Sequence, residues 1–129
     1  MTALYSEIIE EYDHAMKNLA SKLMSLVLES LGLRPGDYSW RDEYCAALQM
    51  NHYPSCPRPA QTMGMAEHTD STFLTVLYQG SVQGLQIKSS DGMWTVVPVV
   101  ANAFVVNVGD LLQVTIIIKI KYCWSFDNL

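Results

Sequence analysis

Short segments rich in β-branched and aromatic residues dominate the chain after residue 36, and this pattern constrains the fold more than any other feature. Glycine, proline, asparagine and aspartate separate the segments, and no stretch of helical spacing lies between them. Strands this short and this close together are typical of antiparallel sandwiches, barrels or jelly rolls. We predict strands near 46–53, 65–69, 73–79, 84–88, 94–99 and 103–108.

The N-terminal region has a different periodicity. Apolar residues recur at helical spacing from Leu4 to Leu31, with charged residues elsewhere on the helical wheel. The pattern predicts one long amphipathic helix, or two. Gly32 can take the left-handed conformation that ends a helix, and Pro35-Gly36 follows as a stop. The fold class expected is therefore mainly β with an N-terminal helix.

Composition and charge exclude several classes of function. The formal net charge of -5 gives no support to nucleic-acid binding, for which a basic face is the usual footprint. The first residues carry acids and no basic region followed by an apolar core, so we expect a cytoplasmic protein rather than a secreted one. No apolar run approaches the roughly 20 residues that span a bilayer. Cys45, Cys56 and Cys123 have no CxxC spacing and are expected to be reduced thiols.

An imidazole and a carboxylate stand two residues apart in the stretch "EHTDST", at His68 and Asp70. On a strand, residues i and i+2 share a face, so the two side chains would lie side by side. Such a pair is two-thirds of the 2-His-1-carboxylate triad that binds Fe(II). The alternative is a surface histidine that is hydrogen-bonded to a neighbouring aspartate in a turn, and the spacing alone favours this alternative.

The surrounding motifs change that balance. They are "MNHYPSCPRP" at 50–59, "GMAEHTDSTFLTVLYQ" at 64–79, "GLQIKSSDGMWTVVPV" at 84–99 and "FVVNVGDLLQ" at 104–113. In this order they closely resemble the plant 2-oxoglutarate- and Fe(II)-dependent dioxygenases, and among these the gibberellin 3-beta-dioxygenases. The resemblance runs from about residue 10 to Gln113, with the gibberellin branch indicated mainly by "HTDSTFLTVLYQ".

The resemblance implies a fold, a reaction and a set of ligands. The fold is a double-stranded β-helix, a jelly roll that follows the long amphipathic helix. The reaction couples oxidative decarboxylation of 2-oxoglutarate to hydroxylation of a small hydrophobic acid such as a gibberellin, with ascorbate as a further candidate cofactor. His68 and Asp70 match the first two Fe(II) ligands, and Asn51 and Tyr53 match positions that hold the co-substrate.

Other residues in the motifs receive structural interpretations. If residues 46–53 form a strand, His52 points away from the face of Asn51 and is a poor candidate ligand. Gly84, Trp94, Gly109 and Asp110 match family positions and are interpreted as turn and core residues. Four apolar residues could contact a substrate, although such residues on strands more often belong to the core. They are Met65, Phe73, Leu77 and Tyr78.

Two parts of the family's site have no counterpart in this sequence. In the family a second metal-binding histidine follows HxD by roughly 55 residues, and an Arg-x-Ser that grips 2-oxoglutarate follows roughly ten residues later. The histidine would fall near Ser125, but no histidine follows His68. The sequence therefore predicts a jelly-roll domain that is incomplete and inactive by itself.

The stretch from residue 114 onward departs from the family pattern. It is dominated by isoleucine, lysine, tyrosine, phenylalanine and asparagine. It is either an ordinary final strand or sequence foreign to the fold, such as translated intron, since these residues have AT-rich codons. The expected organisation is a helical segment over 1–36, an incomplete dioxygenase domain over 37–113 and an atypical tail over 114–129.

Two further functions stay open beside the enzymatic one. A non-catalytic fragment or interaction module could pair its open strand edges with an intact relative. An unrelated jelly-roll binding protein with an accidental HxD is the third reading, and it leaves the ordered motifs unexplained.

Overall fold

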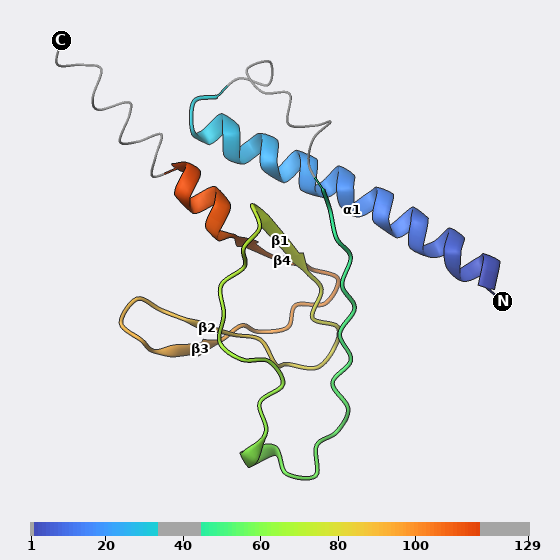
Figure 1. Cartoon of the computed structure of the whole chain (residues 1–129), viewed down its shortest axis with the longest axis vertical. Helices are drawn as coiled ribbons and strands as arrows, with labels where there is room; N and C mark the ends of the chain where they lie inside the picture. Colours follow the sequence, from blue (N-terminus) through green and yellow to red (C-terminus); the bar gives the residue numbers. More distant parts are fainter. Residues whose placement is uncertain (1, 34–44, 117–129) are drawn as a thin grey trace. The chain divides into compact units, whose positions relative to one another are not determined.

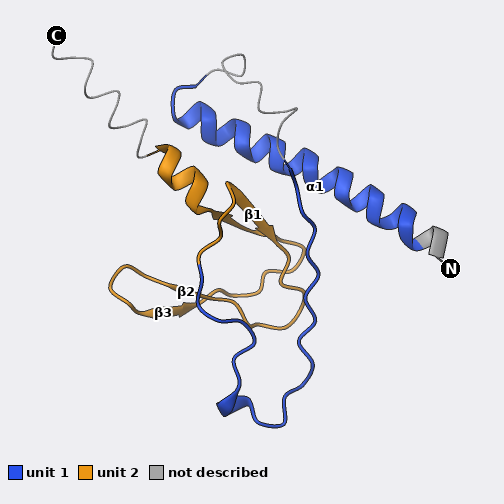
Figure 2. Cartoon of the chain, viewed as in Figure 1, with its two compact units in different colours: residues 1–68 blue, residues 69–129 orange. Residues whose placement is uncertain are grey.

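The computed structural model describes residues 2–33 and 45–116 (Figure 1). The chain divides into two compact units, Met1–His68 and Thr69–Leu129 (Figure 2). Each unit is described by itself. The domain boundaries predicted at residues 36 and 113 stay predictions, because the division between the two units falls elsewhere, after His68.

The first unit begins with one long helix, α1 (Thr2–Ser30), which confirms the predicted helix and decides between one helix and two (Figure 1). Gly32 has a φ of 71°, as expected for a residue that ends a helix. The Gly32 N–H donates to the carbonyl of Glu29 at 2.9 Å, and the Leu33 N–H donates to that of Leu28 at 3.0 Å. These two bonds form a Schellman motif, which satisfies carbonyls that the helix end would otherwise leave unpaired.

Residues 45–68 complete the described part of this unit without any strand. Their one regular element is the short 3₁₀ helix η2 (Pro59–Gln61). The strands predicted near 46–53 and 65–69 are therefore wrong. A strand requires a partner that accepts its ladder hydrogen bonds, and no strand in the described part of the chain pairs with either segment. β-propensity describes a segment by itself and does not show whether another strand pairs with it.

The second unit contains two small antiparallel sheets. β1 (Leu74–Leu77) pairs with β4 (Val105–Val108), with Leu74 opposite Val108 and Leu77 opposite Val105. β2 (Gln86–Lys88) pairs with β3 (Trp94–Val96) in a hairpin (Figure 1). Four of the predicted strands are thus confirmed, each shorter than predicted, and both pairings are antiparallel as expected.

The most buried positions of this unit follow β4. Gly109 is buried, and the Leu112 side chain is only 1% exposed. Leu112 belongs to a helical stretch over 110–116, which places the first residues of the predicted tail in a helix. The rest of that tail lies outside the described residues. Among the described helices, none is both long enough and apolar enough to cross a membrane.

Candidate functional site

His68 and Asp70, the two predicted metal ligands, lie outside the strands. His68 is the last residue of the first unit, and Asp70 follows at the start of the second. Both precede β1 in irregular backbone. The predicted common strand face is therefore wrong, since the strand expected over 65–69 does not form. Each residue has to be judged from its own surroundings.

The His68 ring is oriented by a backbone carbonyl. Its Nδ1 lies 2.8 Å from the carbonyl oxygen of Ala66. A carbonyl oxygen can only accept, so Nδ1 donates, and in the neutral ring the lone pair then lies on Nε2. Histidines that bind metals usually donate their other ring N–H to a carbonyl or carboxylate in this way. His68 thus has the tautomer that an Nε2 metal ligand requires.

Asp70 is half-buried, and its backbone is held by residues that follow β4. The Asp110 N–H donates to the Asp70 carbonyl oxygen at 2.8 Å. The Thr69 hydroxyl donates to Oδ2 of Asp110, also at 2.8 Å. The interpretation of Asp110 as a turn residue does not include these contacts. Its motif "VNVGD" was visible, but only the β1–β4 pairing brings it beside Asp70.

Asn51 and Tyr53, the predicted co-substrate residues, occupy the irregular part of the first unit. Oδ1 of Asn51 accepts a hydrogen bond from the Gln49 side-chain amide at 3.0 Å. The Tyr53 ring packs against Gly64, where an added Cβ would lie 3.2 Å from the ring. Tyr53 is nevertheless 57% exposed, so it does not fill a core. The strand face expected for this pair is not formed.

The donor set fits part of an Fe(II) site. A neutral imidazole and a carboxylate are suitable ligands for Fe(II), and the His68 tautomer is the one needed. Within residues 2–33 and 45–116, no group of three or more His, Cys, Asp or Glu side chains could hold a metal ion. His68 and Asp70 are thus a histidine and a carboxylate of the types found in a facial triad, and the described residues bring no third such side chain to them.

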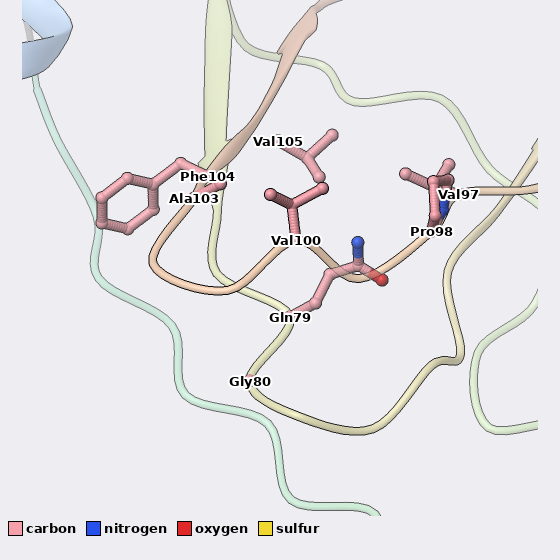
Figure 3. Close-up of a pocket in the computed structure, with 8 residues that line it drawn as sticks. All are labelled: Gln79, Gly80, Val97, Pro98, Val100, Ala103, Phe104 and Val105. Atoms are coloured by element: carbon pink, nitrogen blue, oxygen red, sulfur yellow. The ribbon is translucent and has the colours of Figure 1, made fainter.

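A separate cavity of about 280 Å³ lies in the second unit (Figure 3). Its walls are mainly apolar, and none of the four apolar residues considered as substrate contacts lines it. Tyr78 does not line the cavity, but its ring packs edge-on against the lining residue Phe104, with the ring centroids 5.9 Å apart. The lining residues are Gln79, Gly80, Val97, Pro98, Val100, Ala103, Phe104 and Val105.

Gln79 is the one polar side chain among the cavity's lining residues. Its Oε1 is buried and has no hydrogen-bond partner in the described part of the chain. A buried unpaired acceptor costs about 1–3 kcal/mol. We expect Gln79→Met, which keeps the length and removes the acceptor, to stabilise the fold by about 1 kcal/mol. Urea unfolding followed by circular dichroism measures the change. Gln79→Glu is the control and should destabilise, because it adds a charge; destabilisation by Gln79→Met would show that Oε1 is satisfied.

Comparisons with known proteins agree with the motif order. The model of the "2OG-Fe(II) oxygenase superfamily" matches residues 44–116. Gibberellin 3-beta-dioxygenase 1 of Arabidopsis thaliana is 50% identical over 116 residues, which is 85% of this chain and 32% of the relative. Its namesake from Pisum sativum is 47% identical over 85% of this chain and 31% of the relative.

A relative from outside the gibberellin group matches as well. The 1-aminocyclopropane-1-carboxylate oxidase homolog 3 of Arabidopsis thaliana is 41% identical over 83% of this chain and 29% of its own length. The chain thus spans about a third of the length of the curated relatives it matches. No solved structure matches the chain.

Proposed function

Because the chain belongs to the 2OG-Fe(II) oxygenase superfamily, we propose that it supplies part of an Fe(II)- and 2-oxoglutarate-dependent hydroxylation site. His68 and Asp70 are its two metal ligands, and Asn51 and Tyr53 contact the co-substrate. The proposed substrate is a small hydrophobic acid of the gibberellin type, in keeping with the names of the relatives that share 47–50% identity. The proposed jelly-roll domain covers residues 37–113.

One observation carries this proposal: the His68 ring donates Nδ1–H to the Ala66 carbonyl, within a stretch matched by the family model. That bond holds the imidazole with its lone pair on Nε2. Bound Fe(II) would supply the redox chemistry that couples oxygen and 2-oxoglutarate to hydroxylation. The proposed role of His68 and Asp70 is to bind that ion, and the proposed role of Tyr53 and Asn51 is to bind the dicarboxylate.

The 129-residue chain is proposed to be inactive by itself. A dicarboxylate requires a cation at each end, the metal at one and a bidentate arginine at the other. The sequence has no Arg-x-Ser and no histidine after His68. A metal held by only two side chains is bound weakly, since loss of even outer contacts commonly costs 10–100-fold in affinity.

Anaerobic Fe(II) titration, with and without 2-oxoglutarate, tests the proposed site. We expect weak Fe(II) binding, no 1:1 charge-transfer band with 2-oxoglutarate, and loss of the Fe(II) binding in His68→Ala. His52→Ala is the matched control and should bind as the parent chain does. A stoichiometric chelate band would show that another group completes the site. Equal Fe(II) binding by the His68→Ala chain would remove the metal assignment.

A second candidate function is favoured by the open sheets. Each described sheet has two strands only, so each strand has one edge without a strand partner in the described residues. Such edges can pair with another chain. An interaction module is expected to change the activity of a full-length relative when mixed with it. Unchanged kinetics at a several-fold excess of this chain would exclude the role.

A further inference from the structure

Residues 109 and 110 donate backbone hydrogen bonds to the segment that carries Asp70. The Asp110 N–H donates to the Asp70 carbonyl at 2.8 Å, and the Gly109 N–H donates to the Phe73 carbonyl at 2.9 Å. Oδ2 of Asp110 accepts the Thr69 hydroxyl at 2.8 Å. The segment is therefore held through the residue before Asp70, through Asp70 itself and through the residue just before β1.

The Gly109 backbone packs closely against the backbone of Asp70 and Thr72. A Cβ added at Gly109 would lie 2.0 Å from the Thr72 carbonyl oxygen and 2.9 Å from that of Asp70. The Gln113 N–H donates to the Gly109 carbonyl at 3.1 Å, so Asp110 stands in the first turn of the helical stretch that follows. An N–H in the first turn has no acceptor within the helix, so that of Asp110 is available to donate to the Asp70 carbonyl.

We propose that Asp110 is a positioning residue for Asp70. Its two hydrogen bonds, one through the backbone and one through the carboxylate, fix the backbone from which the Asp70 side chain projects. The inference rests on the function proposed above for Asp70. Asp110 makes no contact with the metal in this proposal. The Thr69 hydroxyl contributes to the positioning as the donor to the Asp110 carboxylate.

Mn(II) titration of the full chain, followed by paramagnetic broadening of amide NMR signals, tests this role. In the parent chain we expect broadening centred on Asp70. Asp110→Ala and Thr69→Val should each weaken Mn(II) binding by about 10-fold. The double variant should bind Mn(II) no more weakly than Asp110→Ala does, because both substitutions remove the same hydrogen bond, that between the Thr69 hydroxyl and the Asp110 carboxylate. Asp110→Asn keeps an acceptor oxygen and should recover most of the affinity.

Asp91→Ala is the matched control. Asp91 accepts hydrogen bonds from Ser89 and Met93 in the β2–β3 turn, so its loss removes one carboxylate and comparable contacts elsewhere. It should leave Mn(II) binding unchanged. If Asp110→Ala and Thr69→Val lower the urea midpoint but bind Mn(II) like the parent chain, Asp110 is only structural and the proposal is overturned. Absence of broadening at Asp70 in the parent chain would instead overturn the proposed metal site, and this proposal with it.

Discussion

Gly109→Ala is expected to destabilise the second unit by on the order of 4 kcal/mol, at the upper end of single-substitution effects. The new Cβ would lie 2.0 Å from the Thr72 carbonyl oxygen and 2.7 Å from its carbonyl carbon. Both obstacles are backbone atoms, so no side-chain rotation can relieve the clash. Relief requires Thr72 to move away, which breaks the Gly109–Phe73 hydrogen bond at the edge of the β1–β4 sheet.

Gly84→Ala is the control for this change. No atom lies within 4 Å of a Cβ placed at Gly84, and its backbone needs no left-handed conformation. Its effect should stay within about 0.5 kcal/mol. Urea unfolding gives both values, and amide spectra show whether signals from 69–77 and 105–110 shift together. A Gly109→Ala chain as stable as the Gly84→Ala chain would mean that these segments do not pack as described.

Local signals in the sequence predicted the elements that depend on local physics. The left-handed glycine after α1 was predicted because few other residues accept that conformation without strain. The four observed strands carry β-branched residues between turn residues, and the 89–93 turn is closed by Asp91 and Gly92. Such features need only neighbours in sequence, so one sequence can reveal them.

The remainder depends on contacts between segments distant in sequence. Residues 46–53 have the composition of a strand, but no strand in the described part of the chain pairs with them. The strand predicted there from β-propensity therefore does not form. The same reason explains why Asp110 was assigned to a turn. Its contacts with Thr69 and Asp70 exist only because β1 and β4 pair, and the register of that pairing cannot be read from either strand alone. The motif order identified the proposed ligands, but not what holds them.

Joining residues 1–113 to the C-terminal segment of the Arabidopsis gibberellin 3-beta-dioxygenase 1 is expected to create a tight Fe(II) site. The family's distal histidine and Arg-x-Ser would then accompany His68 and Asp70. A third protein ligand should strengthen Fe(II) binding by at least about 100-fold, because even outer-shell partners contribute 10–100-fold. The 2-oxoglutarate charge-transfer band should appear at one equivalent of Fe(II), together with succinate release, which we do not expect from the 129-residue chain.

Substitutions within the chimera identify which part of the site this chain provides. His68→Ala and Asp70→Ala should each return the chimera to weak Fe(II) binding, whereas His52→Ala should not, because His52 has no proposed contact with the metal. Tyr53→Phe should raise the 2-oxoglutarate concentration needed for the band and leave Fe(II) affinity unchanged, because the proposed role of Tyr53 is toward the co-substrate. A folded chimera that forms no band would show that residues 1–113 do not supply a working half of the site. A band that survives His68→Ala would place the ligand elsewhere in the chain.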